Sequence, residues 1–213
     1  MIKSQPRQSD RIEEIFQIAM ELFIERGYDD TPLSLIAKEA NLSKSGLFHY
    51  FSSKEHLLFL VHKHIMDKYM VPILEKAERE PDPEKRLRTF IHDYIGVVTR
   101  DPKTTQMLMN EAKRLLPEHY REIFSIWRRI LSVFSGAIAG MKEQGKVPET
   151  LNTSFAAFAA IGMCIWIPNW FDKSRPESKG ELVHTFIKIF MAGISADLAP
   201  NEISRNNAPS VYR

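Results

Sequence analysis

Helical periodicity is the sequence feature that most limits how this chain can fold. Apolar residues recur at helical spacing in almost every segment, and no stretch alternates apolar and polar residues with the period of two that a half-buried strand requires. Ile12, Phe16, Ala19 and Phe23, for example, place one apolar stripe along a helix. The sequence therefore predicts an all-α protein of about nine helices.

Punctuating residues divide the first part of the chain into short helices. Gly27 is placed to end the first helix, and Asn41 can adopt the left-handed conformation that ends the second. Thr31 followed by Pro32 predicts the start of the second helix, with Thr31 as its N-cap. Ser43 is placed to cap a third helix. Three short helices are therefore expected before the first long one.

Longer helices are expected in the rest of the chain. The predicted ranges are about 54–78, 84–99, 103–115, 117–145, 151–171 and 180–198. We divide the chain into a first block of short helices at residues 1–56, a larger second block of helices at residues 57–199, and a flexible polar tail at residues 200–213.

Composition and segment lengths exclude several classes of protein. A hydrophobic fraction of 44% with 26% charged residues is ordinary for a globular chain and excludes wholesale disorder. The N-terminal residues lack the apolar segment of a signal peptide, and the apolar run 155–168 is too short to cross a bilayer. The single cysteine, Cys164, cannot form an internal disulfide. We expect a soluble, cytoplasmic protein with no membrane contact.

Positive charge gathers only locally. A net charge of +2 does not by itself predict a nucleic-acid partner. From residue 42 to residue 54, however, the chain has two lysines and no acid. Lys3, Arg7 and Arg11 form a sparse basic arm, which either reaches a minor groove or is simply a solvated terminus.

The segment 31–54, TPLSLIAKEANLSKSGLFHYFSSK, contains two short capped helices separated by a tight turn. In a helix-turn-helix the second helix enters the major groove while the first crosses the backbone. Lys44, Ser45 and Gly46 stand at the start of this second helix, where free N–H groups and the lysine charge favour a phosphate. Because glycine costs about 1 kcal/mol in a helix interior relative to alanine, Gly46 indicates a close approach of the backbone to DNA.

Four further residues of this segment are predicted from their spacing. Leu47 and Phe51 are expected to anchor the short helices in a core. Tyr50 and Lys54 are four residues apart, which predicts that both point toward the same DNA strand. The alternatives are that Tyr50 is a half-buried core aromatic and that Lys54 is an ordinary solvated lysine.

The segment from about Arg11 to Leu60 resembles the DNA-binding domain of the TetR/AcrR-type regulators. The matching residues are Phe23, Gly27, Thr31, Ile36, Ala37, Ser43, Leu47, Tyr50, Phe51 and Lys54-Glu55 followed by Leu57. Members of this family are all-helical homodimers, usually repressors, whose C-terminal halves bind inducers. The resemblance implies a helix-turn-helix that reads a double-stranded DNA operator.

The DNA-contacting residues follow from the same resemblance. The predicted set is Thr31, Ser34, Ser43, Lys44, Ser45, Gly46, Phe48, His49, Tyr50 and Lys54. Ser34, Ser43 and Lys54 are expected to hold phosphates. Two positions depart from the commonest pattern of the family: Phe48 stands where tyrosine is frequent, and Ser45-Gly46 reverses the usual order of a glycine and a small residue.

Large, soft side chains in the second block, residues 57–199, predict a pocket for a small apolar ligand. We therefore expect residues 1–56 to be the helix-turn-helix domain and residues 57–199 to be the ligand-binding and dimerisation domain. The predicted lining residues are Met107, Phe124, Trp127, Phe158, Met163, Trp166 and Trp170. Packing in a helical core is the alternative for each of them. Arg114, Arg121, Arg128 and Arg129 either hold an anion at the mouth of the pocket or form a solvated face. The segment NEAKRLLPEHYREIF resembles the fatty-acid-metabolism branch of the family, which senses long acyl thioesters.

Small and aromatic residues near the C-terminus predict a dimer interface. The predicted contacts are Phe155, Ala159, Gly162, Phe186, Phe190 and Gly193. Small residues let two helices approach closely, and a helix-turn-helix that reads a palindrome requires a two-fold axis. The alternative is that these helices form only the core of the monomer.

Catalytic, metal and cofactor motifs are absent from the sequence. His62 and His64 lie two residues apart and therefore on different faces of a helix. The chain has no glycine-rich phosphate loop, nucleophile elbow or zinc motif, and Cys164 is expected to be an inert buried thiol. We expect a ligand-responsive homodimeric repressor rather than an enzyme, with no cofactor. The alternatives are a helical ligand-binding or adaptor protein without operator recognition and, more remotely, an enzyme that uses the apolar cavity.

Overall fold

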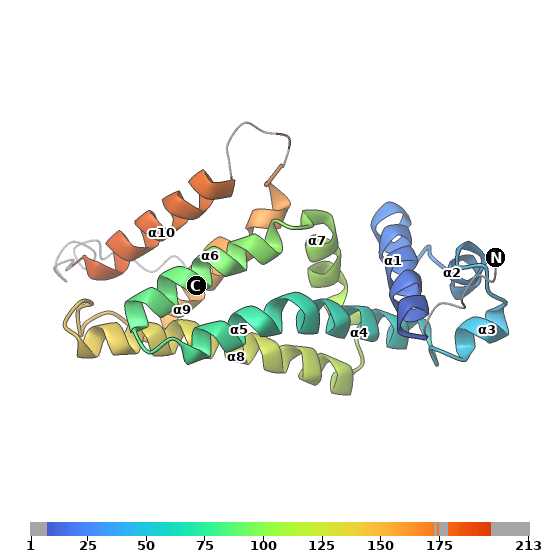
Figure 1. The fold of residues 1–213 in the computed structure, drawn as a ribbon, viewed down its shortest axis with the longest axis horizontal. Coiled ribbons are helices and arrows are strands. Elements are labelled where there is room, and N and C mark those ends of the chain that lie inside the picture. Colours follow the sequence, from blue (N-terminus) through green and yellow to red (C-terminus); the bar gives the residue numbers. More distant parts are fainter. Residues whose placement is uncertain (1–7, 173, 175–178, 197–213) are drawn as a thin grey trace, which may run out of the picture.

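The computed structural model describes residues 8–172, 174 and 179–196, and these residues form helices and connecting loops only (Figure 1). The helices are α1 (Gln8–Arg26), α2 (Leu33–Glu39), α3 (Lys44–Phe48), α4 (Lys54–Ile65), α5 (Val71–Arg79), α6 (Pro83–Val98), α7 (Pro102–Glu111), α8 (Pro117–Glu143), α9 (Thr153–Ile165) and α10 (Lys179–Ser195). A π-helical turn at Met66–Met70 joins α4 to α5 in one continuous run. Counting that run once, the described residues contain nine helices, so the predicted class and number are confirmed. The tail at 200–213 and the arm residues Lys3 and Arg7 lie outside the described residues.

Two groups of helices divide the molecule along its length (Figure 1). The helices α1, α2 and α3 gather at one end, and α4 leads from them into a larger body formed by α5 to α10. Each group has its own cluster of buried apolar side chains. Leu47 and Phe51 lie buried in the N-terminal cluster, as predicted.

Local turn chemistry fixes the N-terminal helices. Gly27 has a φ of +83° and ends α1 with its N–H donating to the Phe23 carbonyl, and Asn41 has a φ of +52° and ends α2. Ser43 Oγ accepts the Gly46 N–H at 3.0 Å, which caps α3. These three predictions are confirmed.

Thr31 has a different role from the one predicted. The residue that caps α2 is Pro32, whose carbonyl accepts the Leu35 N–H at 2.9 Å. The Thr31 side chain is fully buried, and its hydroxyl lies 2.8 Å from the Gly27 carbonyl oxygen and 3.2 Å from that of Leu22. The capping prediction is wrong because the hydroxyl closes the link between α1 and α2 instead.

The larger body is built around α8. Its buried face includes Ile130, Phe134 and Ile138, and the Phe134 ring meets Phe90 of α6 edge to face, with 5.1 Å between the ring centroids. By length and composition alone α8 could cross a membrane. Its apolar character is accounted for by this packing, because the same residues form the centre of the core.

The N-terminal cluster is completed by residues from the larger body. Leu57, Leu58 and Val61 of α4 belong to it, so the predicted domain boundary at residues 56 and 57 falls inside a helix that serves both groups. The contributions from α7, α8 and the link between them are Met107, Leu108, Leu115 and Ile123. The position of α1 to α3 therefore depends on where α7 and the start of α8 lie.

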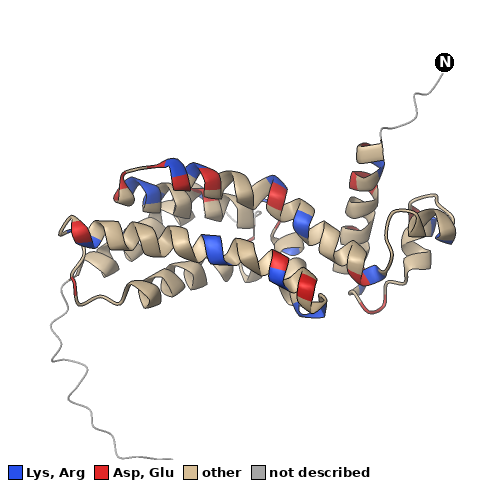
Figure 2. Ribbon diagram, turned by 90° about the horizontal axis from the view of Figure 1, so that it is seen from below, with Lys and Arg blue, Asp and Glu red and all other residues tan. Residues whose placement is uncertain are grey.

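Charged residues of both signs alternate along the helices of the larger body (Figure 2). Several of them form ion pairs, such as Lys76 with Asp93 at 2.7 Å and Arg129 with Glu78 at 2.9 Å. Exposed pairs of this kind contribute little to stability. Arginines and lysines that are paired in this way are less available to an anionic ligand.

The replacement Thr31→Val tests the structural role of the buried hydroxyl. Valine keeps the shape and removes the hydrogen bond, so the free energy of unfolding should fall by about 1–2 kcal/mol, measured by urea denaturation. Ser34→Ala, an exposed change on α2, should alter it by less than about 0.5 kcal/mol. Unchanged stability together with lost DNA binding would show that Thr31 contacts DNA after all.

Candidate functional site

The surface of α3 exposes a mixed set of polar, basic and aromatic side chains. We define the reading surface as Lys44, Ser45, Phe48 and His49, all of which are exposed. Phe48 is 44% exposed, which is unusual for a phenylalanine, and the Lys44 ammonium lies 6.0 Å from the centre of its ring. Two further residues of the predicted set, Ser34 of α2 and Ser43 before α3, are exposed as well. Thr31, being fully buried, cannot reach a phosphate.

Gly46 protects the cap of α3. A Cβ atom at residue 46 would lie 3.2 Å from Ser43 Oγ, the atom that accepts the Gly46 N–H. A larger residue would therefore press on the cap that starts the helix. This internal reason accounts for the glycine, and a close approach to DNA at Gly46 stays a prediction.

Tyr50 and Lys54 do not share a helix. Tyr50 lies in the link after α3, half-buried, with its ring edge to face against His49 at 5.6 Å, whereas Lys54 begins α4. The argument from helical spacing is therefore wrong, because the chain leaves one helix and starts another between the two residues. The structure instead brings Tyr50 next to the reading surface.

Lys54 is held by the link between α1 and α2. Its ammonium lies 4.2 Å from the centre of the Tyr28 ring and donates to the Asp29 carbonyl at 3.2 Å. Partial burial is the main cause that lowers the pKa of Lys54. A phosphate contact by Lys54 stays a prediction, and it would compete with these contacts.

The same link is bound by the segment between α7 and α8. The Arg114 guanidinium donates to both carboxylate oxygens of Asp29, at 2.8 and 2.5 Å, and pairs with Glu111 of α7. It also lies 5.2 Å from the centre of the Tyr28 ring. We call Tyr28, Asp29, Lys54 and Arg114 the linking cluster. Sequence reasoning missed Tyr28 and Asp29, because nothing local indicates a partner 85 residues further along the chain.

Glu55 forms a second set of contacts between the start of α4 and the start of α8. Its Oε1 lies 2.8 Å from His119 Nδ1 and accepts the Leu116 N–H at 2.9 Å. The His119 ring stacks on Phe59, with 4.0 Å between the centroids. The first turn of α4 is thereby fastened to the start of α8 at two places.

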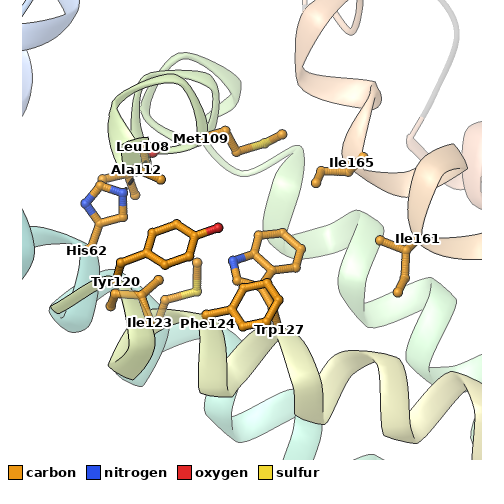
Figure 3. A pocket seen from close by; sticks show the side chains of 11 residues that line it. His62, Leu108, Met109, Ala112, Tyr120, Ile123, Phe124, Trp127, Ile161 and Ile165 are labelled. Atoms are coloured by element: carbon orange, nitrogen blue, oxygen red, sulfur yellow. Dashed lines mark hydrogen bonds between the residues drawn. The ribbon is translucent and has the colours of Figure 1, made fainter. Parts of the chain in front are cut away.

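An apolar cavity of about 260 Å³ lies inside the larger body (Figure 3). Its walls come from α4, the π-helical turn, α7, α8 and α9. The lining residues are His62, Met66, Leu108, Met109, Ala112, Tyr120, Ile123, Phe124, Trp127, Ile161 and Ile165. None of them carries a permanent charge, and their polar side-chain nitrogen and oxygen atoms belong to His62, Tyr120 and Trp127.

Two of the seven predicted ligand residues line this cavity, Phe124 and Trp127. The other five lie elsewhere: Met107 in the N-terminal cluster, Met163 in a narrow crevice beside Phe186 and Phe190, and Phe158, Trp166 and Trp170 exposed at the surface. The α8 wall could have been read from helical spacing, because Tyr120, Ile123, Phe124 and Trp127 share one face. The walls from α4 and α9 depend on tertiary packing that the sequence does not display.

His62 connects the cavity wall to two helices. Its ring lies between the carbonyl oxygens of Leu58 in α4 and Leu108 in α7, at 3.0 and 2.8 Å. Burial is the largest influence and lowers the pKa of His62, while the two carbonyl oxygens oppose it. The His62 ring therefore joins α4 to α7 at the wall of the cavity.

An apolar face on α9 and α10 is exposed to solvent. Phe155 is 73% and Trp166 is 64% exposed, and Phe158 on α9 and Ile189 on α10 are exposed as well. Of the predicted dimer contacts, Phe155, Ala159, Gly162 and Gly193 are exposed and Phe186 is half-buried. Phe190 is buried in the C-terminal cluster, so this residue belongs to the core of the monomer.

The remaining reactive side chains occupy unrelated positions. Cys164 is buried, and burial raises the pKa of its thiol to about 12, in agreement with an inert thiol. Across the part of the chain that the structure describes, no group of three or more His, Cys, Asp or Glu side chains could hold a metal ion.

Comparison with known proteins identifies both parts of the chain. The description "Bacterial regulatory proteins, tetR family" matches residues 15–61, and "Tetracyclin repressor-like, C-terminal domain" matches residues 80–194. HTH-type transcriptional regulator HbdR of Aromatoleum sp. (strain CIB) is 32% identical over 106 residues, which are 50% of this chain and 46% of HbdR. The fatty acid metabolism regulator protein of Bacillus subtilis (strain 168) is 20% identical over 182 residues, or 85% of this chain and 94% of that protein.

Solved structures share the same architecture. AibR in complex with isovaleryl coenzyme A and operator DNA superposes with a TM-score of 0.76 at 26% identity, covering 84% of this chain and 97% of AibR. PfmR from Thermus thermophilus gives a TM-score of 0.76 at 26% identity, covering 85% of this chain and 99% of PfmR. The chain therefore belongs to the TetR family of DNA-binding transcriptional regulators, with its helix-turn-helix at α2 and α3.

Proposed function

We propose that this protein is a repressor that binds a palindromic operator as a homodimer and is released when a small apolar or acyl-type effector enters the cavity. The observation that carries this proposal is the physical connection between the cavity and the reading surface. Ala112 and Tyr120 of the cavity wall bracket a segment in which Arg114 holds the link between α1 and α2 and His119 holds the start of α4. The proposal places the protein in the cytoplasm and gives it no catalytic role.

The exposed side chains of α3 support sequence-specific DNA contact. Lys44, Ser34, Ser43, Ser45 and His49 are all exposed. In this proposal Lys44, Ser34 and Ser43 bind phosphates, and Ser45 and His49 hydrogen-bond to base edges. Phe48 offers an apolar ring edge, which suits the methyl group of thymine. Replacement of the usual tyrosine by Phe48 removes a hydroxyl that could otherwise hold a phosphate.

The double replacement Lys44→Ala and Tyr50→Ala should abolish operator binding while helicity and dimer formation are kept. Loss of the Lys44 charge alone should weaken binding at all sequences and reduce the salt slope by about one. Fluorescence anisotropy with a labelled operator duplex over a range of salt concentrations measures both effects. Lys142→Ala, at the far end of α8, is the matched control. Operator binding that survives the double replacement would show that the reading surface does not contact the operator.

The exposed apolar face on α9 and α10 supports a two-fold dimer. Along α9 and its C-cap residue Trp166, the exposed residues Phe155, Phe158, Gly162 and Trp166 recur at helical spacing and form one stripe. Contiguous exposed apolar surface of this kind marks an interface, and glycine permits close contact between helices. A dimer would place its two α3 helices about 34 Å apart, one turn of DNA.

Phe155→Asp combined with Ile189→Asp tests the dimer. Two carboxylates on the apolar face should convert the protein to a monomer in analytical ultracentrifugation and weaken operator binding by at least about tenfold, because each half-site then binds alone. Ser132→Asp, which adds a charge to an exposed position of α8, should leave the mass and the affinity unchanged. A variant that remains dimeric would place the interface on another face.

An effector in the cavity can act through the contacts around it. It would displace α7 and the link after it, and so disturb the contact of His62 with the Leu108 carbonyl and the pairing of Arg114 with Asp29. The spacing of the two α3 helices would change as a result. The effector must bind one arrangement more tightly than the other for this to happen. Two relatives support an acyl effector: AibR is described with isovaleryl coenzyme A, and the Bacillus subtilis protein is named a fatty acid metabolism regulator.

Arg114→Gln should uncouple the effector from the operator. With octanoyl coenzyme A as the probe, the ratio of operator Kd values with and without probe should fall at least about fivefold in this variant, because coupling of this type is commonly about 5- to 150-fold. Titration of labelled operator at a saturating probe concentration gives the ratio. Arg129→Gln, which loses only the pair with Glu78, should retain it. An unchanged ratio in Arg114→Gln would exclude the linking cluster from the coupling.

A further inference from the structure

Four arginines are near cavity-lining residues in the sequence: Arg114, Arg121, Arg128 and Arg129. In the structure two of them are paired with acidic side chains and two are not. Arg114 is bound by Asp29 and Glu111, and Arg129 is bound by Glu78. Arg121 and Arg128 are exposed and make no hydrogen bond, ion pair or ring contact with any described residue. Glu122, the acid next to Arg121, is already paired with Lys63 at 2.8 Å. Two guanidinium groups on one helix are therefore available to an anion.

Both arginines are on α8, within one helical turn of Phe124, a residue that lines the cavity. Tyr120 and Phe124 line the cavity (Figure 3). They are also 43% and 45% exposed, with their rings stacked at 5.7 Å between centroids, so the cavity meets solvent at this wall, which we call its mouth. Arg121 lies three residues before Phe124 and Arg128 four residues after it. Residues at these spacings are neighbours on a helix surface. Both arginines therefore neighbour Phe124 on the exposed surface of α8.

The interior of the cavity is unsuited to a charged group. A cavity of about 150 Å³ holds one benzene ring, so about 260 Å³ has room for about ten carbon atoms. No lining residue carries a permanent charge that could neutralise a buried anion, and burial of an unpaired charge is strongly unfavourable. A charged head group would thus remain at the mouth while its tail enters.

We propose that Arg121 and Arg128 form a head-group subsite, and that the effector is an acyl chain of up to about ten carbons with an anionic head. This inference rests on the proposed function, in which the effector occupies the cavity. Guanidinium groups suit both carboxylate and phosphate oxygens, which they bind through paired N–H groups. The head is therefore the carboxylate of a free acid or the phosphates of an acyl thioester such as octanoyl coenzyme A.

Calorimetric titration of the full-length chain tests this subsite with three eight-carbon probes: octanoate, octanoyl coenzyme A and neutral 1-octanol. The wild-type protein should bind at least one anionic probe at least about tenfold more tightly than 1-octanol. Arg121→Gln with Arg128→Gln should lose that preference and keep the affinity for 1-octanol. Arg129→Gln with Lys142→Gln removes the same charge from α8 and should change neither value.

The outcomes distinguish a carboxylate head from a phosphate head. They also distinguish failure of the head-group subsite from failure of the proposed acyl effector. A preference for octanoate identifies a carboxylate head, and a preference confined to octanoyl coenzyme A identifies the phosphates. Equal binding of 1-octanol by the wild-type protein, or a preference that survives in the Arg121 and Arg128 variant, would overturn the subsite and leave the cavity as an effector site. Absence of binding by all three probes would overturn the acyl effector itself and the subsite with it.

Discussion

The N-terminal helices depend on apolar packing that they cannot complete by themselves. A five-residue helix such as α3 has no stability of its own, and its anchors Leu47 and Phe51 lie in a cluster that also contains Leu108, Leu115 and Ile123 of the larger body. Burial of such side chains contributes about 1.5–3 kcal/mol each. The orientation of the reading surface is consequently set by the part of the chain that forms the cavity, and the pairing of Arg114 with Asp29 adds a directional contact at the same place.

Local chemistry made part of this structure predictable and left the rest open. Gly27, Asn41 and Ser43 act through their own backbone or the next turn, so the sequence alone predicts their roles. The Thr31 hydroxyl could cap a helix or donate to a distant carbonyl oxygen. It donates to carbonyl oxygens at the end of α1, because packing of the folded chain buries Thr31 there. The aromatic residues of the larger body were the least predictable, because a cavity, a core and an interface use the same residue types. Exposure separates them: Trp127 lines the cavity, and Trp166 lies at the surface.

The cavity and the linking cluster together give the proposed repressor its means of response. An apolar cavity lowers stability in proportion to its volume, because the atoms around it lose packing partners. A ligand that fills the space restores those contacts and so favours the helix arrangement that fits it. The helix α7 contributes both to the cavity wall and to the N-terminal cluster. A shift of α7 caused by a ligand in the cavity therefore changes the packing of the N-terminal cluster directly. No long pathway through the protein is needed.

Selection of bound duplexes from a random DNA pool, at near-physiological salt and with and without octanoyl coenzyme A, tests the central claim most directly. The account predicts one palindromic sequence whose half-sites are about one helical turn apart, recovered without the thioester and lost in its presence. Recovery of sequence-indifferent duplexes under both conditions would contradict the account. It would mean that contacts to phosphate alone hold the DNA and would favour an adaptor protein without operator recognition.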